Sequence, residues 1–318
     1  LHLLSRRQRQ MCIRDRNPEE PAALAMAVEK AKETDAELVM ASDPDADRVG
    51  AAVKNNEGEW VLLNGNQTAL MFVYYLITRW KELGKINGKE YIVKTIVTTE
   101  TIKTIAERNG VEMYDVYTGF KWIANVMREN EGKKNYIGGG EESYGFLCED
   151  FVRDKDAVSA CVILAEIAAW AKDQGLSLYQ LLQKIYVEYG FSKEKGISVV
   201  KKGKSGAEEI EAMMKKFREN PLTEIAGSKV TYFYDYSTLK GKDYAENETV
   251  TLDMPTTSNV LQYFTEDNTK VSIRPSGTEP KIKFYCEVHS KVKSIDELPE
   301  AEKAAEEKIN QIKASLGI

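Results

Sequence analysis

Histidine is nearly absent from this 318-residue sequence, in which only His2 and His289 occur. A zinc site built on several histidines is therefore excluded, and a Ser-His-Asp triad could form only if His289 supplied the imidazole. Because His289 alternates with strand-forming residues in "FYCEVHS" (284–290), we interpret it as an ordinary strand position.

Cysteines and long apolar runs are also scarce. Cys12, Cys148, Cys161 and Cys286 lie far apart and form no C-x-x-C pair, which is typical of free thiols in a reducing cytosol. No run of about 18 apolar residues occurs, so the sequence predicts no transmembrane helix and a cytoplasmic location.

The charge balance shows no excess of basic residues. Forty-four lysines and arginines stand against fifty aspartates and glutamates, for a net charge of −6, with 42% hydrophobic and 30% charged residues. This composition is typical of a globular protein and argues against a nucleic-acid partner. An anionic substrate would therefore need a locally basic pocket. The length allows roughly two or three domains.

The first sixteen residues, "LHLLSRRQRQMCIRDR", differ from the rest. Five arginines and one aspartate give them a charge of +4, which leaves −10 for the remainder of a chain whose total is −6. Their basic cluster follows the apolar residues, unlike the order in a signal peptide. We interpret residues 1–16 as a non-native tail that resembles translated adapter sequence, with a genuine basic tail as the alternative.

Strands and helices alternate from residue 17 to residue 189. Such alternation indicates an α/β layer with a mixed, largely parallel sheet, whose carboxyl-end loops are the expected place for ligands. The predicted helices are 17–35, 68–84, 100–110, 120–130, 156–175 and 177–190, and the predicted strands are 36–42, 59–63, 90–99, 111–119 and the segment leading into a glycine-rich loop at 138–146.

After about residue 190, strand-like segments predominate. They indicate an α+β domain with an antiparallel sheet. The predicted strands are 196–206, 229–239, 248–254, 259–267, 269–277 and 281–290, and the predicted helices are 207–220 and 298–317.

The motif "DPDADR" (43–48) follows a predicted strand. In an extended segment alternate side chains share a face, so Asp43, Asp45 and Asp47 would converge, and their hard oxygens suit Mg²⁺ or Ca²⁺. An EF-hand is excluded because Arg48 and Lys54 occupy the positions that need Gly and Glu. A Ca²⁺-stabilised structural module or a solvated acidic turn are the alternatives.

The motif "GGGEESYGF" (138–146) combines glycines with Glu141, Glu142 and Ser143. These side chains could bind sugar hydroxyls, whereas a plain turn is the structural alternative. A glycosidase-type carboxylate pair is a further reading, but no array of sugar-stacking aromatics accompanies it.

The motif "RPSGTEPKIKF" (274–284) gathers donors for an oxyanion. Arg274 can form a bidentate contact with a phosphate, and Ser276 and Thr278 can add hydrogen bonds from their hydroxyls. Gly277 lets backbone amides approach the same anion. A simple hairpin turn does not need this combination, and no Walker loop is present. The sequence therefore predicts a phosphate-binding loop here.

These three motifs, in this order on an α/β and then an α+β region, resemble the metal, sugar and phosphate loops of the α-D-phosphohexomutase family. The resemblance covers residues 17–318. The segments "TGFKWI" (118–123) and "SNVLQYF" (258–264) look closest to its bacterial phosphoglucomutase branch.

The resemblance implies a fold and an activity. Residues 17–58 would be the C-terminal remnant of domain II, 59–189 domain III, and 190–318 a TATA-binding-protein-like domain IV. The implied reaction exchanges glucose 1-phosphate and glucose 6-phosphate through glucose 1,6-bisphosphate, with Mg²⁺ and an enzyme phosphoserine. A phosphomannomutase or phosphopentomutase is the alternative within the family.

The resemblance also implies roles for individual residues. Arg48 would face the phosphoserine as a catalytic cation, and Lys94 and Lys121 would lie on the substrate side. The expected metal ligands are Asp43, Asp45 and Asp47, the expected sugar ligands Glu141 and Ser143, and the expected phosphate ligands Arg274, Ser276, Gly277 and Thr278.

One departure from the family pattern stands out. The catalytic loop, of the form T-[AG]-S-H-N-P, does not occur in the sequence. We therefore expect a C-terminal fragment that is inactive by itself. A non-catalytic sugar-phosphate-binding protein is the alternative from another functional class.

Overall fold

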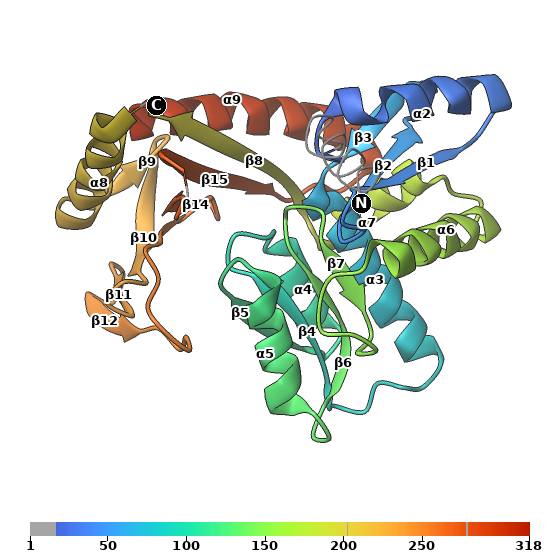
Figure 1. Cartoon of the computed structure of the whole chain (residues 1–318), viewed down its shortest axis with the longest axis horizontal. Coiled ribbons are helices and arrows are strands. Elements are labelled where there is room, and N and C mark those ends of the chain that lie inside the picture. Colours follow the sequence, from blue (N-terminus) through green and yellow to red (C-terminus); the bar gives the residue numbers. More distant parts are fainter. Residues whose placement is uncertain (1–16, 202, 278) are drawn as a thin grey trace, which may run out of the picture. The chain divides into compact units, whose positions relative to one another are not determined.

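The computed structural model describes residues 17–318 apart from positions 202 and 278, so the predicted non-native tail lies outside the described residues. The chain divides into two compact units, one ending at Tyr189 and the other running from Gly190 to Ile318 (Figure 1). The finer division of the first unit into 17–58 and 59–189 stays a prediction.

An antiparallel sheet of three strands opens unit one. Its strands follow one another in chain order: β1 (Leu38–Ser42), β2 (Val49–Lys54) and β3 (Trp60–Leu63). β2 is not among the strands predicted from the sequence: it lies between the predicted strands 36–42 and 59–63 and pairs with both in antiparallel fashion. The links 43–48 and 55–59 are too short for the crossover that a parallel pair requires.

Helix α2 (Pro21–Thr34) covers part of this sheet. It begins at a proline, which fits a first helical turn because its missing N–H needs no partner there. Leu24 is buried in one apolar cluster with Val39 and Ala52 of the sheet. Val39 is the only fully buried residue of β1, because β1 is an edge strand of this sheet.

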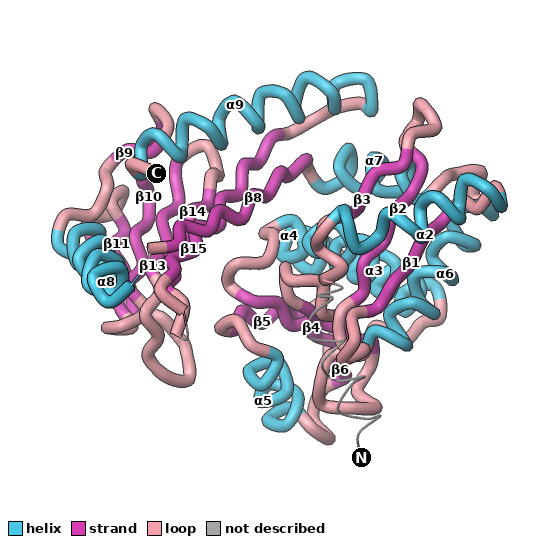
Figure 2. The backbone as a smooth tube through the Cα atoms, turned by 45° about the horizontal axis from the view of Figure 1, so that its top comes forward, coloured by secondary structure: helices cyan, strands magenta, loops and turns pink. Residues whose placement is uncertain are grey.

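The second sheet of unit one has the strand order β5-β4-β6-β7, of which Figure 2 labels β5, β4 and β6. β4 pairs with β5 and β6 in parallel, and β6 pairs with β7 antiparallel. This arrangement confirms the predicted mixed, largely parallel sheet. The strands are β4 (Glu90–Thr95), β5 (Glu112–Val116), β6 (Asn135–Gly140) and β7 (Phe146–Cys148), and the crossover helices are α4 (Thr101–Arg108) and α5 (Phe120–Asn130).

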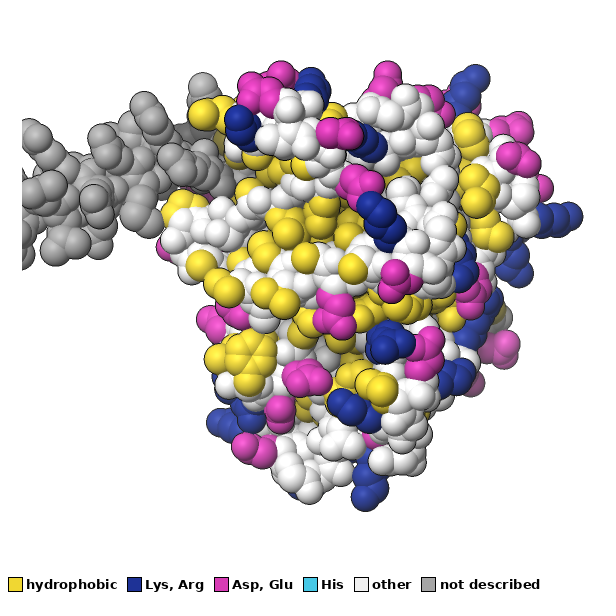
Figure 3. Space-filling model, turned by 90° about the vertical axis from the view of Figure 1, so that its right-hand side faces the viewer, with side chains coloured by type: hydrophobic (Ala, Val, Ile, Leu, Met, Phe, Trp, Pro, Cys, Tyr) yellow, Lys and Arg dark blue, Asp and Glu magenta, His cyan; other side chains and the backbone are white. Residues whose placement is uncertain are grey.

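Longer helices pack around these sheets: α3 (Gly65–Glu82), α6 (Ala157–Asp173) and α7 (Leu178–Tyr189). α3 starts at a reciprocal capping box between Asn64 and Gln67. On α6, Val158 and Val162 are exposed, and Figure 3 shows hydrophobic side chains among charged ones on this side of the molecule. No helix among the described residues is long and apolar enough to cross a membrane.

The sheet of unit two is antiparallel in all its described pairings, which confirms the predicted α+β architecture. Its order is β12-β11-β10-β13-β14-β15-β8, with β9 beside β10. The elements are β8 (Phe191–Val200), α8 (Gly203–Glu219), β9 (Glu224–Ile225), β10 (Ser228–Asp235), β11 (Lys240–Asp243), β12 (Glu248–Thr251), β13 (Leu261–Thr265), β14 (Lys270–Pro275), β15 (Lys281–Ser290), η1 (Ile295–Glu297) and α9 (Leu298–Leu316).

The two faces of this sheet differ in chemistry. On one face, Phe284 of β15 is fully buried and contacts Phe217 of α8 edge to face. Side chains alternate along a strand, so the neighbouring positions point to the other face. There the register places Arg274 of β14 opposite Lys283 of β15.

A buried ionic group also lies on β14 and β15. Lys270 and Glu287 form an ion pair of 2.9 Å with side chains only 2% and 3% exposed, and His289 Nε2 lies 2.7 Å from Glu287 Oε1. Burial disfavours the charged imidazole, but the Glu287 carboxylate outweighs this effect and raises the pKa of His289. His289 is a residue of β15, which confirms its interpretation as a strand position.

We predict that His289→Gln reduces stability most below neutral pH. The folded pKa of His289 is raised above its ordinary 6.5, so its contribution is complete below that value and is lost as the pH rises through the folded pKa. Urea denaturation should show that the difference in unfolding free energy between wild type and variant shrinks as the pH rises above about 6.5. A difference that does not change with pH would contradict this interpretation.

Candidate functional site

The loop 43–48 joins β1 to β2 as a compact turn that Asp43 holds together. Asp43 Oδ1 accepts hydrogen bonds from the amides of Asp47 and Arg48 at 3.0 and 3.1 Å, and Oδ2 accepts one from Arg48 Nε at 3.0 Å. Burial disfavours the charged carboxylate, but these hydrogen bonds outweigh it and lower the pKa of Asp43. Asp43 is therefore a buried anion that fixes the turn.

The backbone of this loop is not extended as expected. Ala46 has a φ of 58°, in the left-handed region, so the segment is not extended and the alternation of side chains is broken. Asp45 is exposed. Across the residues that the structure describes, no three His, Cys, Asp or Glu are grouped so that they could hold a metal ion. The role of these aspartates as metal ligands stays a prediction.

Sequence reasoning missed Lys155, which lies 108 positions from the aspartate that it binds. Its Nζ is 2.6 Å from Asp47 Oδ2 and 3.5 Å from Asp154 Oδ1. Burial disfavours the ammonium, but the contact with Asp47 outweighs it and raises the pKa of Lys155. No spacing pattern could reveal this residue, because only the fold brings it to the loop.

The glycines at 138–140 lie in β6 and not in a loop, which corrects the expected glycine loop. A Cβ at Gly139 would lie 2.3 Å from the Val93 carbonyl oxygen, and one at Gly140 would lie 2.6 Å from the Gly145 carbonyl oxygen. None of the three has a positive φ. Close packing of β6 against its neighbours, rather than backbone freedom, therefore accounts for these glycines.

The loop 141–145 follows β6 and is held at both ends. Glu141 is 7% exposed and its Oε1 accepts a hydrogen bond of 2.7 Å from the Gly119 amide. The Glu141 amide in turn donates to the Gly145 carbonyl at 2.9 Å. Burial is the main reason that the pKa of Glu141 is raised, and Lys155 acts in the opposite direction. Ser143 is half-buried in the same loop.

The loops 43–48 and 141–145 lie side by side in unit one. The Val49 amide donates to the Tyr144 carbonyl at 3.0 Å, and Arg48 and Gly145 form an isolated antiparallel bridge. The structure thus brings together two of the three sequence motifs, although they are far apart along the chain.

The two lysines expected on the substrate side have different surroundings. Lys94 ends β4 with a side chain 1% exposed, and its Nζ lies 2.6 Å from Asp115 Oδ1 and 2.9 Å from Glu100 Oε1. Lys121 is exposed on α5, with its Nζ 5.0 Å from the centroid of the Trp122 ring. Lys94 is therefore held by two carboxylates, whereas the Lys121 side chain is open to solvent.

In unit two, the motif 274–284 spans the end of β14, the turn that follows it and the start of β15. Arg274 is half-buried at the end of β14. The Ser276 amide donates to the Lys281 carbonyl at 2.8 Å, and Ser276 Oγ accepts from the Glu279 amide at 3.3 Å. A Cβ placed on Gly277 would meet nothing within 4 Å, so the turn is open there. Thr278 lies outside the described residues.

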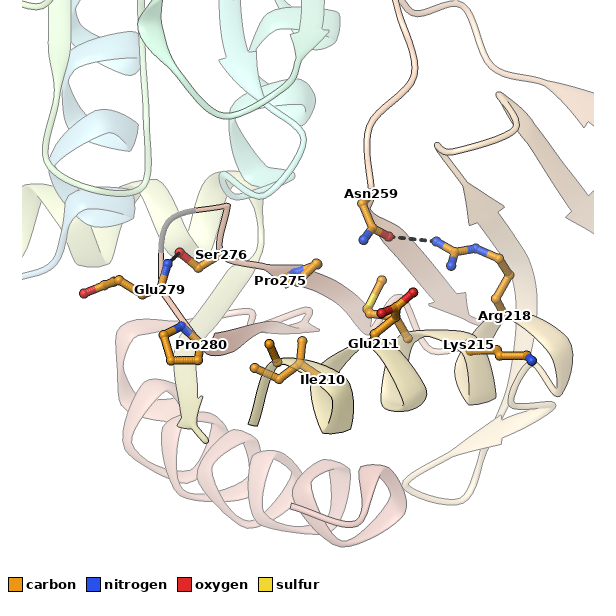
Figure 4. A pocket seen from close by; sticks show the side chains of 11 residues that line it. Ile210, Glu211, Lys215, Arg218, Asn259, Pro275, Ser276, Glu279 and Pro280 are labelled. Atoms are coloured by element: carbon orange, nitrogen blue, oxygen red, sulfur yellow. Dashed lines mark hydrogen bonds between the residues drawn. The ribbon is translucent and has the colours of Figure 1, made fainter. Parts of the chain in front are cut away.

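A cavity of ≈ 480 Å³ borders this turn in unit two (Figure 4). Pro275 and Ser276 line it on the side of the turn, and Ile210 lines it on the side of α8. Arg218 is part of the same lining and binds Asn259 Oδ1 through Nη2 at 2.9 Å. Of the predicted phosphate ligands that the structure describes, Ser276 lines this cavity, whereas Arg274 and Gly277 do not.

Three family models match the chain. They describe phosphoglucomutase/phosphomannomutase alpha/beta/alpha domain II, matched by residues 7–58, alpha/beta/alpha domain III, matched by 64–189, and the C-terminal domain, matched by 198–305.

Relatives with substantial identity include two phosphoglucomutases. The one from Staphylococcus haemolyticus is 34% identical over 277 residues, which are 87% of this chain and 50% of the relative. The one from Staphylococcus aureus strain MRSA252 is 38% identical over 273 residues, 86% of this chain and 48% of the relative. The chain thus spans about half the length of these relatives.

Solved structures support the fold. A phosphoglucomutase/phosphomannomutase family protein from Burkholderia thailandensis superimposes with a TM-score of 0.59 at 19% identity, covering 95% of this chain and 52% of that one. Parafusin from Paramecium, described as a phosphoglucomutase, gives 0.54 at 18% identity, covering 86% and 45%.

We predict that Lys94→Met destabilises unit one by about 2–3 kcal/mol near neutral pH, because Glu100 and Asp115 lose the buried cation that holds them. The loss should shrink below about pH 4, where carboxylates become protonated. Denaturation curves of both chains at several pH values measure it.

The control variant is Lys103→Met, which removes an exposed lysine of α4 whose contact with Glu107 spans 3.9 Å. It should leave stability nearly unchanged. If the two substitutions lowered the free energy of unfolding equally, the ion pairs of Lys94 with Glu100 and Asp115 would not be what stabilises unit one.

Proposed function

Because the chain belongs to the phosphoglucomutase/phosphomannomutase family of α-D-phosphohexomutases, we propose that it forms the sugar- and phosphate-binding part of a phosphoglucomutase. The reaction is reversible phosphoryl transfer between glucose 1-phosphate and glucose 6-phosphate through glucose 1,6-bisphosphate, in the cytoplasm. The observation that carries this proposal is the contact between loops 43–48 and 141–145. Phosphoryl transfer to a sugar needs charged groups beside groups that orient a hydroxyl.

In this proposal, Asp43, Asp45 and Asp47 bind Mg²⁺. Their oxygens are the ligands that this ion prefers. In the structure Arg48 binds Asp43 and Lys155 binds Asp47. An Mg²⁺ ion held by these aspartates would supply positive charge for phosphoryl transfer. Arg48 supplies a further fixed positive charge on the phosphoserine side.

The substrate contacts proposed for unit one are polar. The buried carboxylate of Glu141 and the hydroxyl of Ser143 accept and donate hydrogen bonds to sugar hydroxyls. Lys121, which is exposed, contributes a mobile cation on the phosphate side. Lys94 serves on the substrate side together with the carboxylates that hold it.

The phosphate that does not react is bound by the turn 274–280 in this proposal. The guanidinium of Arg274 matches two phosphate oxygens at once, and Ser276 and Thr278 supply hydroxyls. Gly277, where the turn is open, lets backbone amides approach the anion. Lys283, opposite Arg274 in the strand register, adds positive charge beside it.

We predict that Arg274→Ala weakens binding of glucose 1,6-bisphosphate to the chain by about tenfold to a hundredfold, because a charge-assisted bidentate contact is lost. Titration calorimetry on the variant and on wild type measures this. Arg79→Ala is the control, since Arg79 of α3 is a surface residue paired with Glu82.

Indistinguishable binding by wild type and Arg274→Ala would remove the phosphate clamp from the proposal. Replacing the ligand with mannose 1,6-bisphosphate in the same titration distinguishes the glucose enzyme from a phosphomannomutase. We expect glucose 1,6-bisphosphate to bind more tightly, as the similar relatives are phosphoglucomutases.

We predict no turnover of glucose 1-phosphate by the 318-residue chain alone, because it contains no T-[AG]-S-H-N-P segment and thus no serine in that setting. A coupled assay that reports glucose 6-phosphate, with Mg²⁺ and glucose 1,6-bisphosphate present, tests this. Sustained turnover above the uncatalysed background would contradict it.

A further inference from the structure

We propose that Glu142 is a positioning residue, which fixes the Ser143 hydroxyl for a sugar through a hydrogen bond to Thr95. The inference rests on the proposed role of Ser143 as a sugar ligand, and it names the group that holds this serine in place. The sugar contacts proposed for the loop 141–145 fall on Glu141 and Ser143, so Glu142 between them has no role until now.

The first step concerns where the two glutamates of the loop are bound. Glu141 accepts a hydrogen bond from the Gly119 amide, directly before α5. Glu142 Oε2 instead accepts one of 3.2 Å from Thr95 Oγ1, at the end of β4. Consecutive side chains of the loop are thus bound to different elements. Ser143, which follows them, is attached to a segment that is held on two sides.

The second step concerns the contact at Thr95. Thr95 and Thr98 are 0% exposed, and their hydroxyl oxygens lie 2.8 Å apart. An ionised carboxylate carries no proton, so Thr95 donates its only hydroxyl proton to Glu142, and Thr98 donates to Thr95. A buried chain of donors that ends on a charge polarises each of its hydrogen bonds. Glu142 is therefore bound to a hydroxyl that cannot turn away without breaking a second hydrogen bond.

The third step concerns the backbone of the loop. A Cβ placed on Gly65, the first residue of α3, would lie 2.0 Å from the Glu142 carbonyl oxygen and 2.7 Å from the Tyr144 amide nitrogen. Tyr144 has a φ of 69°, a left-handed conformation that persists only where the surroundings fix it. Glu142 on one side, and the hydrogen bond from Val49 to the Tyr144 carbonyl on the other, supply that constraint.

Ser143 is half-buried and lies between the two residues that are fixed in this way. A hydroxyl that is already oriented loses less conformational entropy when a sugar binds to it. Releasing Glu142 from Thr95 therefore weakens sugar binding without removing any atom of the proposed sugar contacts.

The first experiment measures hydrogen exchange of the chain without a ligand. Thr95→Val keeps the shape of the side chain but removes the donor. It should speed exchange of the Glu141 and Val49 amides, whose acceptors are carbonyls of the loop, about tenfold. Thr95→Ser keeps the hydroxyl and should restore slow exchange. The amide of Met71, which is buried within α3, should exchange at the wild-type rate in both variants, because it opens only with the whole unit.

The second experiment measures the affinity for glucose 1,6-bisphosphate by titration calorimetry. Glu142→Ala should weaken binding about tenfold, whereas Glu142→Gln keeps an oxygen acceptor for Thr95 and should stay close to wild type. In a double-mutant cycle with Ser143→Ala, Glu142→Ala should cause almost no further loss, because its effect passes through Ser143. Glu107→Ala is the control, since Glu107 is an exposed glutamate of α4.

Unchanged exchange in Thr95→Val overturns the inference, as does a Met71 amide that speeds up equally, because the contact would then serve stability alone. Additive losses from Glu142→Ala and Ser143→Ala also overturn it and leave the sugar role of Ser143 intact. If wild type does not bind the bisphosphate, or if Ser143→Ala binds it normally, that sugar role and the inference both fail. The phosphate clamp is tested separately through Arg274→Ala.

Discussion

The hydrogen bond from the Val49 amide to the Tyr144 carbonyl joins the two sheets of unit one at the point where the candidate site lies. One strand of the first sheet begins there, and the turn between β6 and β7 of the second sheet passes beside it. The bridge between Arg48 and Gly145 and the ion pair between Lys155 and Asp47 also connect the loop 43–48 to the chain around the second sheet. The loops 43–48 and 141–145 are thereby held in one fixed relation.

This arrangement allows charged groups to be buried. Asp43, Glu141 and Lys94 are each at most 7% exposed, a state that is unfavourable unless every charge finds a partner. Asp43 is satisfied by the amides of its own turn, Glu141 by the Gly119 amide, and Lys94 by two carboxylates. Buried polar groups of this kind are tolerated because their partners are fixed in space by the fold.

In unit two, a sheet holds the charged side chains of the candidate turn in place. Its apolar face binds helices and supplies stability, while the alternate positions of the same strands carry Arg274 and Lys283. The turn after β14 continues the pairing of β14 with β15, because the Ser276 amide bonds to the Lys281 carbonyl. The strand pairing, rather than contacts within the turn, therefore fixes the backbone at Ser276. The turn can thus stay open to solvent at Gly277 without losing its shape.

The sequence by itself determined the helices, most strands and the three motifs, because periodicity, prolines and short polar patterns are local properties. It also placed Glu141 and Arg274 in segments that end strands. It predicted a loop at the glycines 138–140, which lie in a strand, because their close approach to Val93 is a contact between distant segments. For the same reason it could not find Lys155. Only the tertiary structure decided which carboxylate meets which cation, because such pairs depend on distances that neighbours along the chain do not encode.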